Sequence, residues 1–185
     1  MAKNPIILNK KVIAESSLFR IESLTLEFSN AQRRDYERLA RGCPGGGAVL
    51  IVPMLDADTV LLSREYAAGV GRYELALPKG KIEAGEQILA AANRELKEEV
   101  GYGAKTLQHL KSISIAPSYL EHMTDIILAT DLYEERLPGD EPEEIEVVPW
   151  KMDNLAELFS RGECTEARSI AALFLTREFL NHVDR

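Results

Sequence analysis

The segment 80–102, with the sequence GKIEAGEQILAAANRELKEEVGY, constrains the fold of this chain more than any other stretch. Its later part, 86–100, has apolar residues at the spacing of one amphipathic helix, and Gly101 follows as a residue at which helices commonly end. At about 100° per residue, one stripe of the helix collects the apolar residues Leu89, Ala92, Leu96 and Val100. We therefore expect a helix whose stripe packs against the rest of the domain.

Glu95, Glu98 and Glu99 lie beside this stripe. Their i+3 and i+4 spacing places the three carboxylates on one arc of the helix, where like charges repel by about 0.2–0.5 kcal/mol per pair. A divalent cation would turn this repulsion into attraction, and ligands that are all oxygen favour a hard ion such as Mg²⁺ over zinc. The alternative is a solvated helix face on which Arg94 pairs with Glu98.

The wider pattern favours the metal site. Gly80 is followed after five residues by Glu86, then after seven more by Arg94-Glu95-Leu96, one variable residue, Glu98-Glu99, another variable residue, Gly101 and a bulky side chain. This pattern resembles the Nudix box. The resemblance implies a divalent-metal-dependent hydrolase that cleaves a diphosphate linked to another group.

The formal net charge of −8 limits the partners of the protein. A surface with this excess of carboxylates cannot neutralise a long phosphate backbone or an anionic membrane, so we expect neither a nucleic-acid nor a membrane partner. A small anionic substrate, held by a metal and by local arginines, is compatible with the charge.

Cys43 and Cys164 stand alone in the sequence, without paired spacing, so they predict neither a disulfide framework nor a zinc site. Reduced thiols of this kind are typical of intracellular proteins. The apolar run at 5–8 is too short for a signal peptide or a membrane span. We expect a cytoplasmic protein.

The rest of the chain predicts an α+β fold. Interrupted alternation at 19–28 and a candidate strand at 33–39 indicate a small antiparallel ribbon, and the glycine-rich segment 43–47 predicts a joint, so we divide the chain into domains 1–44 and 45–185. Further strands are predicted at 48–55, 59–63, 73–77, 107–116, 126–130 and 145–150, and helices at 153–161 and 166–182. The order suggests a mixed sheet with helices on its faces. The resemblance implies the αβα Nudix sandwich, and a homodimer formed through the N-terminal ribbon.

Segments outside the box resemble the ADP-ribose pyrophosphatase branch of the family, and in particular its members that hydrolyse ADP compounds. They are RRDYER at 33–38, REYA at 64–67, APSY at 116–119, GDEPE at 139–143 and EAR at 166–168. One position departs from the branch, because Ala67 stands where many of its members have an arginine. The full set of phosphate-binding residues of the branch therefore cannot be assigned to this chain.

The resemblance also assigns site residues. Glu95 and Glu99 are expected to bind Mg²⁺, for which Mn²⁺ can substitute; Glu98 binds it directly or through water and contributes to catalysis, and the Lys79 carbonyl completes the site. Gly80, Glu86, Arg94 and Gly101 are expected to support the box, with Glu86 and Arg94 paired to each other.

The general base is expected in the acidic loop 141–146, with Glu143 first and Glu141 second, against the alternative of a solvated acidic turn. The residues proposed for substrate binding are Arg34, Glu37, Arg38 and Arg64. The function these assignments imply is hydrolysis of ADP-linked compounds, such as ADP-ribose, NADH and diadenosine triphosphate, with release of AMP. The alternatives are a nucleotide-sugar pyrophosphatase acting, for example, on GDP-mannose, and a Nudix-fold sensor that binds ADP-ribose without cleaving it.

Overall fold

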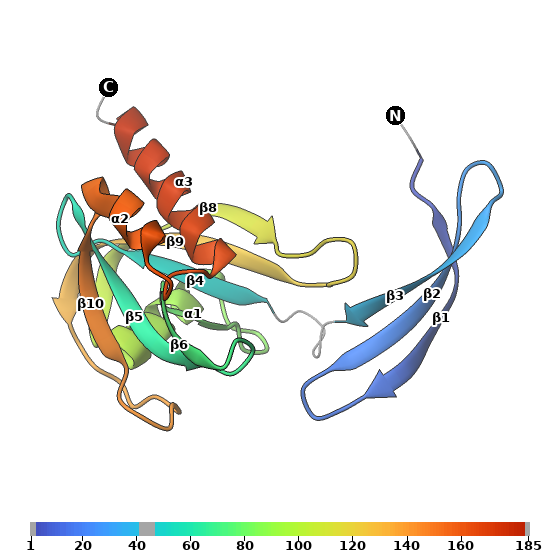
Figure 1. The fold of residues 1–185 in the computed structure, drawn as a ribbon, viewed down its shortest axis with the longest axis horizontal. Coiled ribbons are helices and arrows are strands. Elements are labelled where there is room, and N and C mark those ends of the chain that lie inside the picture. The colour runs from blue at the N-terminus through green and yellow to red at the C-terminus, as the bar shows by residue number, and fades with distance from the viewer. Residues whose placement is uncertain (1–2, 41–46, 184–185) are drawn as a thin grey trace. The chain divides into compact units, whose positions relative to one another are not determined.

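The structure is a computed structural model that describes residues 3–40 and 47–183 (Figure 1). The chain forms two compact units. The N-terminal unit comprises Met1–Gly46 and Ser114–Met123, and the main unit comprises Gly47–Ile113 and Thr124–Arg185. The predicted joint at 43–47, with Cys43, lies outside the described residues except for Gly47. The predicted domain boundary between 44 and 45 therefore stays a prediction.

The N-terminal unit is built on a three-stranded antiparallel sheet. Its strands are β1 (Ile6–Glu15), β2 (Arg20–Glu27) and β3 (Arg33–Ala40), in the order β1-β2-β3. The turn between β2 and β3 is closed by a hydrogen bond of 2.9 Å from the Phe28 N–H to the Gln32 carbonyl, and Ala31 has a φ of 58°. The predicted N-terminal ribbon is confirmed. Sequence alternation did not delimit β1, because few of its apolar side chains alternate with polar ones.

The main unit contains two sheets. One has the order β10-β5-β6, formed by β10 (Glu146–Lys151), β5 (Thr59–Ala67) and β6 (Arg72–Ala76). The other has the order β7-β4-β9-β8, formed by β7 (Lys79–Lys81), β4 (Ala48–Pro53), β9 (Met123–Glu134) and β8 (Tyr102–Ser114). This second sheet is mixed, because β4 runs parallel to β9 and antiparallel to β7.

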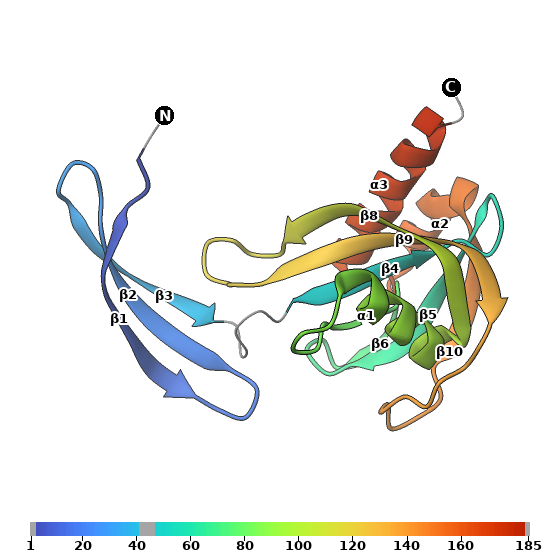
Figure 2. The ribbon, with the colours of Figure 1, turned by 180° about the vertical axis from the view of Figure 1, so that it is seen from behind.

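Helices cover the two faces of these sheets. They are α1 (Ile88–Glu95), the π-helical turn η1 (Leu96–Val100), the 3₁₀ turn η2 (Met152–Asn154), α2 (Leu155–Ser160) and α3 (Ala167–Val183). Helix α1 lies behind the strands in Figure 1 and in front of them in Figure 2. No helix among the described residues is both long and apolar enough to cross a membrane.

Strand β4 shows why this arrangement is stable. Its successive side chains point to opposite faces, so Leu50 and Val52 pack with residues of α2 and α3, whereas Val49 and Ile51 pack with residues of α1 and η1. All four of these side chains are fully buried. A strand that is apolar at every position is therefore buried on both sides, as the continuous apolar run predicts. The predicted αβα sandwich, preceded in sequence by an antiparallel ribbon, is confirmed.

Two local predictions were wrong. The helix was expected from 86 but begins at Ile88, and Leu89 is 40% exposed, because the whole first turn lies outside the packed interface and burial begins at Ala91. No strand was predicted between the strand 73–77 and the box helix, but Lys79–Lys81 forms β7. Its short extended backbone pairs with β4, with Gly80 opposite Val49, and so covers part of an otherwise open strand edge.

Candidate functional site

The end of the box helix changes from α to π geometry at Leu96, so Glu98 and Glu99 lie in a π turn. Leu96 and Val100 anchor this turn in the core, and Gly101 ends it with a φ of 81°. This left-handed conformation favours glycine, which explains the residue at that position. Single π turns inside helices are rare and occur frequently at functional sites.

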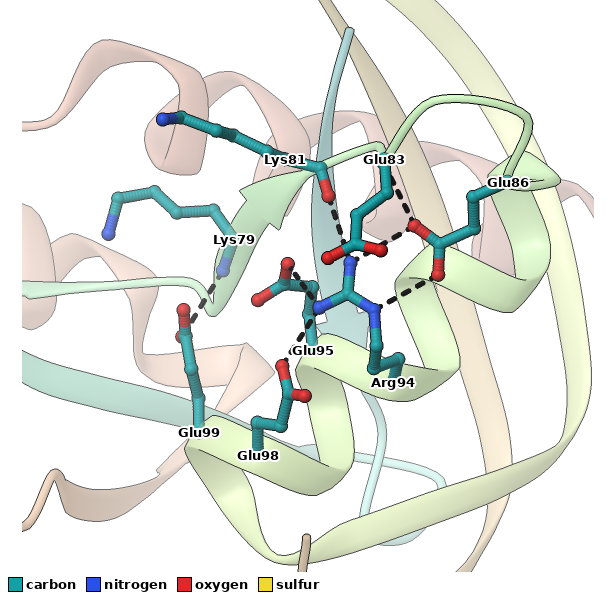
Figure 3. A network of polar contacts seen from close by, with 8 residues as sticks. All are labelled: Lys79, Lys81, Glu83, Glu86, Arg94, Glu95, Glu98 and Glu99. Carbon is teal, nitrogen blue, oxygen red and sulfur yellow. Dashed lines mark hydrogen bonds and ion pairs between the residues drawn. The ribbon is translucent and has the colours of Figure 1, made fainter. Parts of the chain in front are cut away.

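Arg94 connects four groups around the box (Figure 3). Its Nη1 lies 2.8 Å from Glu95 Oε1 and 2.9 Å from Glu98 Oε2. Its Nε lies 3.0 Å from Glu86 Oε1, and its Nη2 donates to the Lys81 carbonyl at 3.0 Å. Both ion pairs considered from the sequence, with Glu86 and with Glu98, are present. Hydrogen bonding to Glu86 outweighs burial and raises the pKa of Arg94 above its ordinary value, so this guanidinium stays charged and offsets part of the repulsion.

The carboxylate of Glu95 lies against the backbone of β7. A Cβ atom added at Gly80 would overlap the Glu95 carboxyl group, so glycine is required at this position for Glu95 to keep its place. Burial raises the pKa of Glu95, although the hydrogen bond from Arg94 opposes the shift. The fixed glycine of the sequence pattern thus has a steric reason in the fold.

Replacing Gly80 with alanine is expected to lower the free energy of unfolding by about 1–3 kcal/mol, the usual cost of overpacking a dense site. Gly69→Ala is the matched control, because an added Cβ there meets nothing within 4 Å. Urea denaturation of both variants measures the difference. Equal stability of the two variants would show that Glu95 can move away from β7 without cost.

Glu99 is the most deeply buried of the three box carboxylates, with 4% of its surface exposed. Its Oε2 accepts a hydrogen bond of 3.2 Å from the Lys79 N–H. Burial raises the pKa of Glu99 to about 8; the charge of Lys79 opposes the shift and the charge of Glu65 adds to it. A carboxylate in this position is costly to ionise unless a cation compensates it.

Glu65 belongs to this cluster, although the sequence interpretation used it only as part of a resembling segment. Its Oε2 lies 3.1 Å from Lys79 Nζ. Residue 65 follows Leu61 and Ser63 on the same face of β5, and Leu61 packs in the core beneath α1. Alternation along β5 was therefore the signal that pointed Glu65 towards the box helix.

The donor set fits a hard divalent cation. Glu95, Glu98 and Glu99 offer only oxygen ligands, which favour a hard ion such as Mg²⁺ or Mn²⁺ over zinc. The burial that raises the pKa of Glu95 and of Glu99 is the penalty that a bound cation would remove. Within the described ranges, no three acidic, histidine or cysteine side chains already surround one point, because Arg94 holds Glu95 and Glu98.

The acidic loop presents two glutamates differently. The Oε1 of Glu143 accepts a hydrogen bond of 2.7 Å from the Tyr73 hydroxyl, which raises the pKa of Tyr73. The charge of Glu141, in contrast, contributes to the raised pKa of Glu95. The charge of Glu141 therefore contributes a minor part of the shift of Glu95, whereas Glu143 is held by Tyr73 of β6.

The arginines expected to bind substrate have different surroundings. Arg64 Nε lies 2.8 Å from Glu146 Oε2, and its Nη1 pairs with Glu163. In the N-terminal unit, Arg38 pairs with Glu22 at 2.9 Å and with Glu121 at 3.2 Å. Two other residues of β3, Arg34 and Glu37, are exposed.

Comparison with known proteins extends over nearly the whole chain. The NUDIX domain family matches residues 45–174, and the NudE-type Nudix hydrolase N-terminal domain matches residues 5–38. The ADP compounds hydrolase NudE of Escherichia coli is 49% identical over 178 residues, which cover 96% of this chain and 94% of that protein. The ADP-ribose pyrophosphatase of Mycobacterium tuberculosis is 33% identical over 177 residues. The match covers 87% of this chain and 84% of that protein.

Among solved structures, a crystal structure of an ADP compounds hydrolase superimposes with a TM-score of 0.90 at 48% sequence identity. The match covers 98% of this chain and 97% of the other. The fold of this chain is therefore shared with a known enzyme.

Proposed function

Because this chain belongs to the Nudix hydrolase family, we propose that it hydrolyses the diphosphate bond of ADP-linked compounds and releases AMP. The observation that carries this proposal is the buried pair Glu95 and Glu99, beside Glu98 in a π turn, in a chain that is 49% identical to an ADP compounds hydrolase. ADP-ribose, NADH and diadenosine triphosphate are the substrates proposed.

Glu95, Glu98, Glu99 and the Lys79 carbonyl are the groups that would hold Mg²⁺, or Mn²⁺ in its place. When bound, such an ion neutralises charge on the diphosphate oxygens and lowers the pKa of a coordinated water. Arg94 would then keep Glu86 as its main partner while Glu95 and Glu98 turn to the ion. Arg94 now bonds to all three glutamates. Because a guanidinium has five donors, Arg94 can lose the bonds to Glu95 and Glu98 and still keep those to Glu86.

We propose Glu141 as the group that accepts the proton of the attacking water. The order expected from the sequence placed Glu143 first, and two observations favour the reverse. Glu141 acts on the pKa of Glu95, and Glu143 is engaged by the Tyr73 hydroxyl at 2.7 Å. A general base must be able to turn to the water it deprotonates, and Glu143 would first have to give up the hydrogen bond from Tyr73.

Substrate recognition is proposed for Arg34, Glu37, Arg38 and Arg64. Arg34 and Glu37 are exposed on β3 and so are accessible to a nucleotide. Arg38 and Arg64 would exchange a carboxylate partner for a phosphate, which offers the same bidentate geometry.

A panel of ADP-ribose, NADH, diadenosine triphosphate and GDP-mannose, incubated with the protein and Mg²⁺, tests the function. We expect AMP from the first three compounds and little GMP from the fourth, with product measured by ion-exchange chromatography. EDTA is the control and is expected to abolish turnover. GMP as the dominant product would favour a nucleotide-sugar pyrophosphatase, and binding of ADP-ribose without product would favour a sensor.

We also propose a homodimer formed through the N-terminal sheet. Strand β1 exposes a row of large apolar side chains, namely Ile6, Ile7, Leu8, Val12 and Ile13. Successive side chains of a strand point to opposite faces, so these residues expose apolar surface on both faces of β1. Large exposed apolar side chains gathered on one strand of a small sheet are typical of an interaction site. A cytoplasmic location, expected from the isolated cysteines, remains a prediction.

Sedimentation velocity at micromolar concentration is expected to give the mass of two chains of 20.6 kDa each. Charged residues in the row, as in Leu8→Lys with Ile13→Lys, are expected to shift the protein to the monomer because they desolvate on association. Asp35→Lys, at an exposed position of β3, is the control for the added charge. A monomeric parent protein would contradict the dimer.

A further inference from the structure

The segment 135–137, which directly follows β9, is bonded to the end of the π turn. The Leu137 N–H donates to the Lys97 carbonyl at 3.2 Å, and the Glu135 N–H donates to the Gly101 carbonyl at 3.1 Å. The last carbonyls of a helix have no partner within the helix, and here the backbone of another element supplies two of the missing donors.

Side chains reinforce the same contact. Lys97 Nζ lies 2.9 Å from Glu135 Oε2 and 5.8 Å from the centre of the Tyr133 ring. The Lys97 side chain is 16% exposed and that of Glu135 is 44% exposed, so the lysine end of this pair is shielded from solvent and the carboxylate end is not. The guanidinium of Arg136 lies against Gly101, where an added Cβ would come within 2.9 Å of its Nη2.

The contact between Lys97 and Glu135 matters because of where Lys97 lies in the sequence. It lies in the π turn immediately before Glu98 and Glu99, two of the proposed cation ligands. A π turn is uncommon, and here backbone and side-chain contacts from outside the helix reinforce it. Segment 135–137 also leads into the loop that carries Glu141. It is therefore connected both to the proposed cation ligands Glu98 and Glu99 and to the proposed general base.

We propose that Lys97 and Glu135 are positioning residues: their ion pair fixes the π turn and thereby holds Glu98 and Glu99 in the geometry that binds the cation. This inference rests on the proposed metal-dependent function. Neither residue touches the substrate or the reacting atoms. Each acts through the turn that it fixes.

Charge and geometry predict opposite results for one of the two residues. If only charge mattered, Lys97→Met would tighten cation binding, because a positive charge beside the site is removed, and Glu135→Gln would weaken it. If the pair positions the turn, each variant weakens binding, and the double variant is no worse than either single one, because both singles break the same interaction.

The experiment is titration of the substrate-free protein with Mn²⁺, with the free ion followed by electron paramagnetic resonance. We expect Lys97→Met, Glu135→Gln and the double variant each to bind about tenfold more weakly, the effect usual for residues that orient metal ligands. Lys97→Arg is expected to restore affinity, since it can form the same ion pair. Thermal unfolding without metal verifies that all variants are folded at the temperature of the titration.

Lys151→Met is the matched control, because Lys151 Nζ also pairs with a carboxylate, Asp58, at 2.6 Å in the main unit. Its Mn²⁺ affinity is expected to stay unchanged. Unchanged or tighter binding by Lys97→Met, or additive losses in the double variant, overturns the positioning role while the proposed function stands. A parent protein that takes up no Mn²⁺ overturns both the metal assignment and this inference.

Discussion

Replacing Glu99 with glutamine is expected to lower kcat/KM about a thousandfold, since removal of one fixed electrostatic group from an active site costs on that order. The fold is expected to persist, because a glutamine oxygen can still accept the hydrogen bond from the Lys79 N–H. Initial rates with ADP-ribose over a range of Mg²⁺ concentrations measure the loss. Activity close to that of the parent protein would refute the metal-binding role of Glu99.

The same variant has a second expected effect, on the stability of the metal-free protein. Burial raises the pKa of Glu99 in the folded state to about 8, from an ordinary value of 4.5. Its contribution to stability is thus fully present below about pH 4.5 and is lost as the pH rises through about 8. Glu99→Gln does not titrate, so in EDTA its Tm at pH 8 is expected to exceed that of the parent protein.

Excess Mg²⁺ is the control for that measurement. A cation that binds the folded parent protein stabilises it, whereas the variant has lost a ligand, so the Tm difference at pH 8 should shrink or change sign. A parent Tm that is flat between pH 5 and pH 8 in EDTA would contradict the buried, uncompensated charge.

Replacing Glu141 with glutamine is expected to lower kcat about a hundredfold, the lower range for loss of a general base. The reason is that the charge of Glu141 contributes to the raised pKa of Glu95, whereas Glu143 in the same loop is held by the Tyr73 hydroxyl. Glu143→Gln is the matched control within the same loop and is expected to cost less than about tenfold, because Glu143 is bonded to Tyr73.

A pH–rate profile separates the two glutamates. Loss of a base removes the rise of kcat with pH at the acidic end, whereas disturbance of the loop lowers kcat equally at all pH values. Tyr73→Phe releases Glu143 without changing its charge and is expected to leave the profile of the parent protein intact. The reverse result, with the acidic limb lost in Glu143→Gln, would restore the order expected from the sequence.

Local periodicity accounts for the parts of the fold that the sequence predicted. Spacing along a few residues predicts the helix of the box, the glycine that ends this helix and the fully apolar strand β4. The resemblance to the Nudix family is confirmed. Leu89 shows the limit of such reasoning. Its phase on the helix is that of the buried stripe, but burial also needs a neighbouring element, and the first turn has none over it.

Long-range contacts account for what the sequence did not predict. The ion pair of Glu65 with Lys79 joins residues 14 apart in the chain, and the bond of Tyr73 to Glu143 joins residues 70 apart. No pattern along the chain encodes either distance. The proposed order, with Glu141 before Glu143, rests on the second of these contacts, because it holds Glu143 on β6.

The sequence by itself determined that three carboxylates lie on one arc of a helix beside an apolar stripe, because the helical repeat is a local property of the backbone. Only the tertiary structure decided that Glu95 rests on Gly80, that Glu99 is buried and bonded to the Lys79 N–H of β7, and that the turn carrying Glu98 is π-helical. These features depend on which elements pack together, and it is packing that gives the acidic helix face buried carboxylates whose charge a bound cation would offset.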